Sequence, residues 1–423
     1  MKLERVSLFN SRREIFLFFS ALIFIFSYSL LMEYHNFKAL TQFNSNLVDA
    51  IVLKQYTKSK TKKGKTRSYQ VLKLKAKKGF YFYTAAKTST PDLVGKKLQL
   101  ELYAGDTTFY EYLNTFYASS QILNIEDTLK NSLNQTMASE HKNLDAIAIY
   151  KALYTATPLP QNLQIVFSNL GVSHLFAISG FHLGVLSFVL FFLLKFPYKF
   201  LQNSYFPYRN SKSDIFILIS LILFAYLIFL DIPASLLRAF TMLVIGFILY
   251  DRGIKIISMQ TLSLTILILL ALFPRLFFEL GFWLSVSGVF YIFLFFIHFT
   301  TLSKLWQFIL IPFWVYFLML PYSLVIFTNF SLYHPLSIIW TSLFTLFYPL
   351  SIALHLIGFG GLFDTLLTAL ISLANEQKSI HISQIWLYLH IFLSLLSIYF
   401  KNALYPLFGL SIVIFIYSIL QVL

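Results

Sequence analysis

The sequence predicts a mainly α-helical membrane protein: a polytopic transmembrane helix bundle of about ten spans with a small external β-barrel domain of the OB type. Three observations predict this fold class. Hydrophobic residues make up 57% of the 423 residues and charged residues only 12%, about half the share of a soluble domain. Many apolar runs reach the roughly 20 residues that cross a bilayer as a helix. The net charge of +15 gathers in one polar segment. The absence of cysteine excludes a disulfide-stapled domain and a Cys-ligated metal site.

The first 32 residues combine a basic start with an apolar run over Ile15–Met32. A secretory signal has the same outline. The run is longer than a typical signal core, so we expect an uncleaved first transmembrane helix. Because positive residues beside a span tend to stay inside, we expect a cytoplasmic N-terminus, which places the next segment on the outer side of the membrane.

Residues 33–121 form a basic, polar segment that we expect to be a periplasmic OB-like domain. Thr57–Ser68 has the composition of a loop, whereas Tyr69–Lys77 alternates as a strand does. Barrels of this type bind single strands with basic grooves and stacking aromatic rings. The alternative is solvated charge on a domain that only packs against the membrane part. The candidate DNA-binding residues are Lys65, Arg67, Tyr69, Lys73, Lys75, Lys77, Tyr81 and Tyr83.

Residues 122–157 are polar with apolar residues at helical spacing, which predicts amphipathic interfacial helices. Residues 158–423 are hydrophobic almost throughout and form the predicted polytopic domain. Leu362–Ala374 is short for a span, so we expect it to be interfacial or re-entrant. With the first helix, the candidate spans are Leu175–Leu194, Ile215–Leu230, Pro233–Tyr250, Ile257–Phe273, Leu276–Ile297, Phe308–Phe327, Leu336–Ile357, Ile385–Phe400 and Leu404–Leu420.

The most informative motif is His174-Leu-Phe-Ala-Ile-Ser-Gly-Phe-His-Leu-Gly184. On one continuous helix its small residues share a narrow stripe that lets another helix approach closely. The polar residues fall on an adjoining face and should meet protein or a wet cavity, because lipid would leave them unsatisfied. Helix packing with two hydrogen-bonded histidines is the alternative, and the spacing of the histidines does not predict a metal site. The stripe comprises Ser173, Ala177, Gly180, Gly184 and Ser187, of which Ala177, Gly180 and Gly184 are the candidate packing residues. The candidate path residues are His174, Ser179 and His182.

Arg238 lies more than a turn inside a predicted span. An arginine at mid-bilayer costs roughly 2.5–3.5 kcal/mol on insertion scales, so it should be paired, snorkel, or line a water-filled path. Asp231 and Glu279 are candidate partners for pairing, and a guanidinium is also well suited to phosphate. Ser235 lies one turn before it, and Ser285 lies in another small and polar patch. We expect both serines to line the path with Arg238.

These motifs resemble those of the ComEC family, the inner-membrane DNA-uptake channels of naturally competent bacteria. The motif that begins at His174 differs from the family's own only at interchangeable apolar positions. Pro233–Ala239 and Gly281–Ser285 resemble the second and third motifs, the third with a tryptophan where a glutamine is usual. Ser331–Leu336 resembles the fourth, although Ile338 replaces an expected asparagine.

The resemblance implies that the basic outer domain gathers DNA and that the bundle passes a single strand to the cytoplasm. The implied partners are a cytoplasmic DNA-translocating ATPase, a periplasmic DNA receptor protein and membrane lipids. Many family members carry a C-terminal metallo-β-lactamase-like domain, for which this chain has no room, so we expect a short form. The sequence holds no Walker loop, HExxH or GxSxG motif. We therefore expect no cofactor, no metal site and no enzymatic activity.

Two other functions stay open. A membrane-embedded hydrolase or transferase acting on a lipid-linked or cell-wall polyanion could use His182 as a general base, but no carboxylate lies close in sequence to orient it. A small-molecule secondary transporter would leave the basic outer domain unexplained. We therefore predict an inner-membrane channel for uptake of single-stranded DNA during natural transformation.

Overall fold

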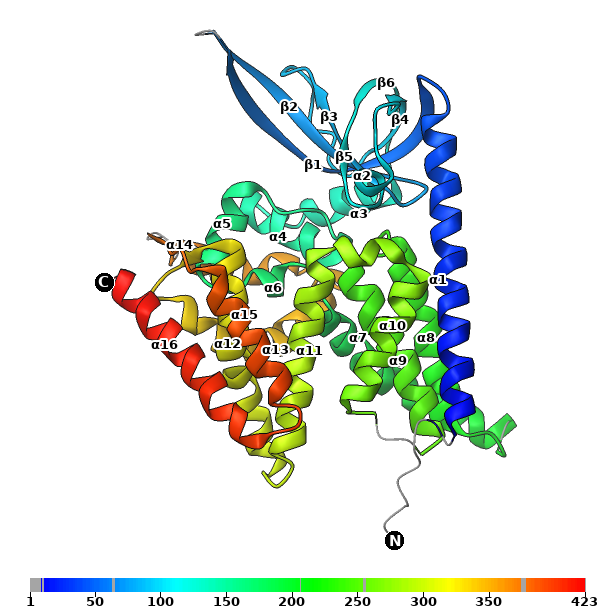
Figure 1. The fold of residues 1–423 in the computed structure, drawn as a ribbon, viewed down its shortest axis with the longest axis vertical. Helices are drawn as coiled ribbons and strands as arrows, with labels where there is room; N and C mark the ends of the chain where they lie inside the picture. The colour runs from blue at the N-terminus through cyan, green and yellow to red at the C-terminus, as the bar shows by residue number, and fades with distance from the viewer. Residues whose placement is uncertain are drawn as a thin grey trace.

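The computed structural model describes residues 9, 11–62, 65–205, 207–253, 256–373 and 378–422, except for the side chains of residues 60–62, 65–67 and 378. The side chains of Lys65 and Arg67, two predicted DNA-binding residues, therefore lie outside the described ones. Figure 1 shows two parts, a β-domain and a helical bundle below it, with one long helix running along the edge of both.

That long helix, α1 (Arg12–Thr41), belongs to both parts of the molecule. Ser11 caps it by accepting a backbone N–H of the first turn at 3.2 Å. The predicted boundary between the first span and the outer domain, at residue 33, falls inside this continuous helix. Its last turns carry Phe37 and Leu40 into the core of the outer domain, so the apolar run of the span extends directly into a folding core.

The outer domain is a mixed six-stranded sheet in the order β5-β3-β2-β1-β4-β6. Strand β5 runs parallel to β3, and the other neighbours are antiparallel. Between β5 and β6 the Ala118 N–H donates to the Tyr83 carbonyl at 2.9 Å. One continuous segment thus pairs first with β3 and then with β4. The strands are β1 (Asn46–Lys62), β2 (Lys65–Ala76), β3 (Tyr81–Ala86), β4 (Lys97–Tyr103), β5 (Phe116–Tyr117) and β6 (Ser119–Glu126), with helix α2 (Phe109–Leu113) before β5.

The β1–β2 hairpin is longer than predicted, because residues 57–62 and 65–68 extend its strands instead of forming a loop. Ser59 lies opposite Ser68 in the ladder, and their hydroxyls are 3.3 Å apart. Such polar cross-strand pairs stabilise a ladder, and composition alone does not reveal them. The predicted alternation of β2 is confirmed in the core, where Leu72 and Leu74 are completely buried.

The predicted amphipathic region divides into a strand and two helices. Residues 122–126 belong to β6, whereas α3 (Leu129–Ala138) and α4 (Leu144–Thr155) are helical. Side chains of Thr128 and Asn143 cap them by accepting backbone N–H groups. With α5 (Gln161–Asn169), α4 lies between the sheet and the bundle (Figure 1).

Eight helices in the described part of the chain are long and apolar enough to cross a membrane. The predicted count of about ten is not confirmed, because Ile257–Phe273 and Ile385–Phe400 contain the shorter helices α10 (Met259–Leu272) and α15 (Gln384–Leu396). The short apolar stretch near the C-terminus forms η3 (Gly360–Phe363) and α14 (Asp364–Ser372). Besides α1, the long helices are α7 (Gly180–Tyr205), α8 (Ser211–Phe229), α9 (Ala234–Asp251), α11 (Leu280–His298), α12 (Lys304–Phe327), η2–α13 (His334–Leu336 and Ser337–Leu356) and η4–α16 (Lys401–Ala403 and Leu404–Val422).

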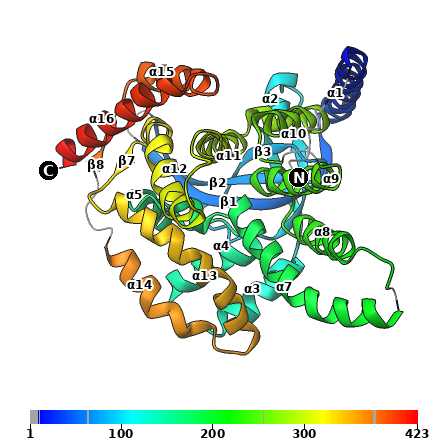
Figure 2. The same ribbon diagram turned by 90° about the horizontal axis from the view of Figure 1, so that it is seen from below.

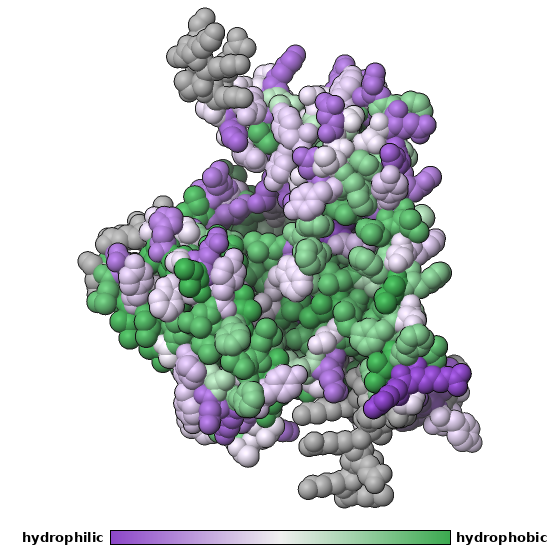
Figure 3. Space-filling model, viewed as in Figure 1, coloured by the Kyte–Doolittle hydropathy of each residue, from purple (hydrophilic) through white to green (hydrophobic). Residues whose placement is uncertain are grey.

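The surface of the bundle matches the demands of a bilayer. On the face that Figure 3 shows, a hydrophobic belt covers the helices, with hydrophilic surface on the outer domain and at the opposite end. Figure 2 shows the helices from that opposite end, with α1 at one edge and α15 and α16 at another. Apolar side chains facing lipid and polar ends facing water are what a membrane requires. The chain is a multi-pass membrane protein.

Polar contacts hold the outer domain on the bundle. Arg275, in the 3₁₀ turn η1 (Pro274–Phe278) after α10, donates two hydrogen bonds to the Glu33 carboxylate, at 2.8 and 2.6 Å. It also donates to the Tyr112 carbonyl at 2.8 Å, and its guanidinium lies 4.3 Å from the Tyr112 ring centre. Burial raises the pKa of Tyr112 to about 12. This cluster fixes the domain directly above the α10–α11 turn.

Candidate functional site

A break between two helices, at residues 177–179, forms the centre of the candidate site. The short helix α6 (Ser173–Phe176) ends there, Ala177 is extended, and α7 begins at Gly180. The predicted span Leu175–Leu194 is therefore not one helix, and the prediction of a single small-residue stripe is wrong. A break inside a membrane protein frees backbone groups that side chains or a wet cavity must satisfy.

The side chain of His182 bonds to the backbone at the break. Its Nδ1 accepts the Ser179 backbone N–H at 3.2 Å and faces the Ser179 hydroxyl at 3.0 Å. A side chain that binds nearby backbone in this way competes with a continuous helix. Since Nδ1 accepts, the proton of the neutral ring is on Nε2. That atom is buried without a hydrogen-bond partner, against the rings of Phe344 and Tyr348.

Ser235 satisfies one of the freed carbonyls. Its hydroxyl donates to the Ile178 carbonyl at 3.0 Å, from the first turn of α9. The structure thus places Ser235 beside the break, as a support for its backbone.

Gly180 allows α7 to begin in direct contact with α9. A Cβ atom added at Gly180 would lie 2.8 Å from the Ala239 Cβ and 3.0 Å from Nη2 of Arg238, so a larger residue could enter only if α9 moved. The other two predicted packing residues make no such approach. The same construction at Gly184 meets no atom within 4 Å, and Ala177 is exposed. The first turn of α7 therefore lies against the Arg238 guanidinium.

Arg238 is buried in the bundle, with 4% of its surface exposed. Its Nε donates to the Ser285 hydroxyl of α11 at 2.9 Å, and Nη1 lies 3.1 Å from the sulfur of Met242. Within the described ranges no carboxylate forms an ion pair with it. The predicted partner Asp231 pairs instead with Lys130. Arg238 is therefore a buried cation with neutral hydrogen-bond partners.

His174 lies apart from this cluster. Its Nε2 is 3.3 Å from the Thr341 hydroxyl of α13, and its side chain is exposed. The structure thus brings together Ser179, His182, Ser235, Arg238 and Ser285 around the break and leaves His174 on the α13 side. Met242, Phe344 and Tyr348 complete the surroundings. Sequence reasoning missed these three because Met, Phe and Tyr are common in any span.

The lysine face of β2 points toward the bundle rather than away from it. Lys73 lies 5.4 Å from the centre of the Tyr81 ring and 5.7 Å from that of Tyr83, and Lys75 lies 5.6 Å from the Tyr81 centre. Lys75 also donates to the Asp231 carbonyl, in the turn before α9, at 2.5 Å. Figure 3 shows hydrophilic surface in the hollow between the outer domain and the bundle. Of the remaining predicted residues, Tyr69 is half-buried and Lys77 is exposed.

Electrostatics at this junction favour an anion. Burial lowers the pKa of Lys75, an effect opposed by Asp231 and Glu279. Burial, followed by the nearby charge of Lys73, lowers the pKa of Lys54 on β1. Lysines that are partly removed from water and lie close together have lowered pKa values, because their charged forms are less stable. A nearby polyanion stabilises those charged forms in place of the lost water.

A comparison with protein families decides the affiliation of the chain. The family model described as "Competence protein" matches residues 156–422, which include the long apolar helices other than α1, together with the break and Arg238. The chain belongs to the competence protein family. That membership points to a role in DNA uptake. No curated protein and no solved structure matches the chain. The geometry around Arg238 described above therefore rests on the structure of this chain alone.

Proposed function

We propose that this competence protein is an inner-membrane channel that passes single-stranded DNA into the cytoplasm during natural transformation. The observation that carries the proposal is the environment of Arg238. This residue of α9 is a buried cation without an ion-pair partner among the described residues. It lies against the first residue of α7, inside the region that the family model matches. A cation without a counter-ion in lipid surroundings is costly. A passing phosphate would supply the missing negative charge.

The broken helix adds to this attraction. The N-terminus of α7 carries the positive end of the helix dipole, and Arg238 lies next to it. Half-helix N-termini point at anionic groups of the substrate in other membrane proteins with discontinuous helices. The partners of Arg238 are a hydroxyl and a thioether, so no carboxylate repels the phosphate. A site with a single cation flanked by neutral groups also binds weakly enough to release each phosphate, as conduction requires.

The outer domain would deliver the strand to this site. Lys54, Lys73 and Lys75, together with Tyr81, lie at the junction with the bundle, where they could hold phosphates and stack bases. We propose a small OB-like barrel for this domain, supported by the continuous segment that joins β3 to β4. The periplasm is its proposed compartment.

The channel would need a source of energy and of DNA. We propose a cytoplasmic DNA-translocating ATPase as the motor and a periplasmic DNA receptor protein as the donor, with α1 placing the N-terminus in the cytoplasm. Lipids would cover the hydrophobic belt. The hydrolase alternative gains no support, since His182 is completely buried and its Nδ1 is engaged by Ser179.

Uptake of fluorescent DNA tests the proposal in cells that carry Arg238→Gln, which keeps a polar side chain and removes the charge. The proposal predicts that DNA reaches the periplasm and fails to enter the cytoplasm. The matched control is Arg209→Gln, which removes an arginine from an exposed ion pair with Asp214 and should leave uptake unchanged. Normal cytoplasmic uptake in Arg238→Gln, at a normal level of membrane protein, would refute the role of this cation.

A further inference from the structure

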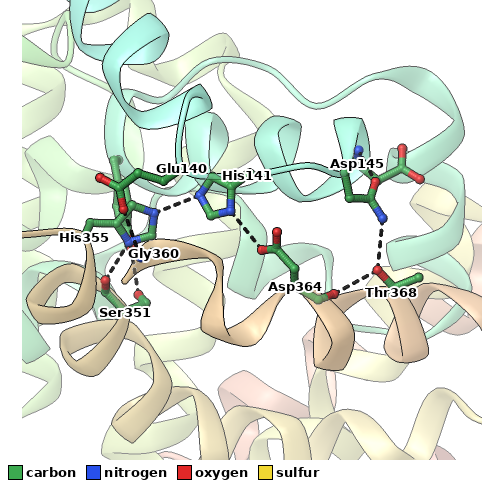
Figure 4. A network of polar contacts seen from close by, with 10 residues as sticks. Glu140, His141, Asp145, Ser351, His355, Gly360, Asp364 and Thr368 are labelled. Carbon is green, nitrogen blue, oxygen red and sulfur yellow. Dashed lines mark hydrogen bonds and ion pairs between the residues drawn. The ribbon is translucent and has the colours of Figure 1, made fainter. Parts of the chain in front are cut away.

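A second polar cluster lies where the α3–α4 turn meets the end of α13 and the start of α14 (Figure 4). His141 from the turn faces His355 of α13, with 3.0 Å between the two Nε2 atoms. The His141 Nδ1 is 2.9 Å from a carboxylate oxygen of Asp364, and the His355 Nδ1 is 2.7 Å from the Ser351 carbonyl. Glu140 accepts the Gly360 N–H at 2.9 Å. The DNA path proposed above uses none of these groups.

The outer partners of the two rings fix where their protons are. A carbonyl oxygen can only accept, so His355 Nδ1 must donate to Ser351. Asp364 opens α14, where the helix dipole favours an ionised carboxylate, and an ionised carboxylate also only accepts. His141 Nδ1 must then donate to Asp364. If both rings were neutral, both Nε2 atoms would be bare lone pairs facing each other at 3.0 Å.

Two facing lone pairs at that distance repel, so a positively charged species must lie between them. The separation is that of a normal hydrogen bond between nitrogen atoms. We propose that His141 and His355 form a proton-binding site: one shared proton makes the pair cationic and fastens the α3–α4 turn to α13 and α14. This inference concerns the outer junction and does not rest on the proposed DNA path.

The surroundings suit a cation. The His141 ring stacks on Tyr150 at 4.5 Å, and His355 meets the ring edges or faces of Tyr150 and Tyr154 at 4.6 and 5.1 Å; aromatic faces stabilise a nearby cation. The Tyr154 hydroxyl donates to Ser351 at 2.8 Å and lies 3.3 Å from His355 Nδ1, so it can accept there.

The charged groups near the pair come from two elements, the α3–α4 turn and α14. Asp364 belongs to α14 and Glu140 to the turn, and both carry a carboxylate to this cluster. Lys142 of the turn opposes a positive pair from a hollow of about 440 Å³, which Glu140 and Asp364 also line. Two carboxylates against one lysine leave a net negative environment, while His141 itself is buried. Water can therefore exchange the proton through the hollow beside Asp364.

A shared proton explains the geometry better than a metal ion does. Zinc binds histidine at about 2.0–2.1 Å, which puts two tetrahedral ligand atoms roughly 3.3 Å apart or more. The described residues contain no group of three or more His, Asp or Glu side chains placed to hold a metal ion. Zinc remains a measurable competitor in the experiment below.

Spin labels on the full chain test the proposal, because the natural sequence has no cysteine to interfere. Ser139→Cys on the turn and Leu362→Cys on η3 are both exposed positions for nitroxide labels. In lipid nanodiscs we expect a narrow distance distribution at about pH 5.5 and a broad or longer one at about pH 9, as the pair loses its proton. An unchanged distribution across this range would overturn the proposal.

Variants separate the shared proton from other causes. His355→Gln can donate an amide N–H to His141 without titrating, so we expect the pH response to disappear. Asp364→Asn removes the anion that stabilises the cation, so the transition should move to lower pH by about one unit or more. The control His381→Gln changes an exposed histidine elsewhere and should keep the wild-type response. If added zinc narrows the distance distribution at about pH 9 and a chelator broadens it at about pH 5.5, the site binds a metal ion. That result would refute the shared proton.

Discussion

Replacing Arg238 with methionine should leave the stability of the protein nearly unchanged while it lowers DNA uptake. Methionine has similar length and is apolar, so Arg238→Met removes the buried charge and keeps most of the packing. Arg238 is the fifth residue of α9, about 6 Å from the start of the helix at 1.5 Å per residue. The mid-bilayer cost of roughly 2.5–3.5 kcal/mol is therefore an upper bound here.

The substitution also removes favourable contacts. The hydrogen bond to the Ser285 hydroxyl involves a charged donor and contributes about 1.5–3 kcal/mol. The two terms nearly cancel, so we expect the free energy of unfolding to change by no more than about 1 kcal/mol. A phosphate at this site would lose a contact of the same kind. At 1.4 kcal/mol per factor of ten, DNA uptake should fall roughly 10- to 150-fold.

Two assays separate the effects. Thermal unfolding in detergent, with Arg209→Met as control at an exposed ion pair, reports stability. Counting transformants per cell reports uptake. A strongly destabilised Arg238→Met protein would show that the arginine holds the bundle together, and wild-type transformation would show that no phosphate meets it. Either result refutes the reasoning.

Four further predictions follow from other contacts. Gly180→Val should destabilise the chain by roughly 1–3 kcal/mol in thermal unfolding, because the added Cβ meets α9, whereas Gly184→Val should be tolerated; equal losses would contradict the packing argument. Lys73→Ala combined with Lys75→Ala should weaken binding of single-stranded DNA to the full chain and reduce its logarithmic salt slope by about 1.4; an unchanged slope would mean that these lysines touch no phosphate. Because burial lowers the pKa of Lys75 in the folded state, the unfolded state binds more protons, so wild-type stability should rise with pH from the folded pKa up to the ordinary value of 10.5; Lys75→Met should flatten that rise. Arg275→Ala should cost up to about 3 kcal/mol by leaving Glu33 unpaired, and an unaltered melting temperature would show that the outer domain is held by other contacts.

The sequence predicts the helical membrane class, the position of the outer domain and the buried face of β2, because composition and periodicity determine these features directly. Leu72 and Leu74 are buried as alternation requires. Hydrophobic periodicity does not predict the break at residues 177–179, where the contacts of a side chain compete with the local preference for helix. His182 accepts the Ser179 N–H, and this three-residue contact has no signature in hydropathy.

Contacts between segments distant in sequence were also beyond prediction. Asp231 is a reasonable partner for Arg238 by sequence separation, yet it pairs with Lys130, which is 101 residues away. The His141–His355 pair joins residues 214 positions apart. Such pairings depend on how the turn between α3 and α4 meets the end of α13, which no local pattern contains.

Trapping DNA in the act of passage tests the central claim most directly. The cysteine-free chain allows Ser179→Cys, at the break, to carry a photo-crosslinker, with Tyr417→Cys on the exposed face of α16 as control. A bulky group attached to the trailing end of the DNA would stall the strand inside the bundle. The account predicts crosslinking to DNA from position 179 and not from position 417, with loss of the product when Arg238→Gln is added. Crosslinking of equal yield at both positions, or none at position 179 while uptake proceeds, would contradict it.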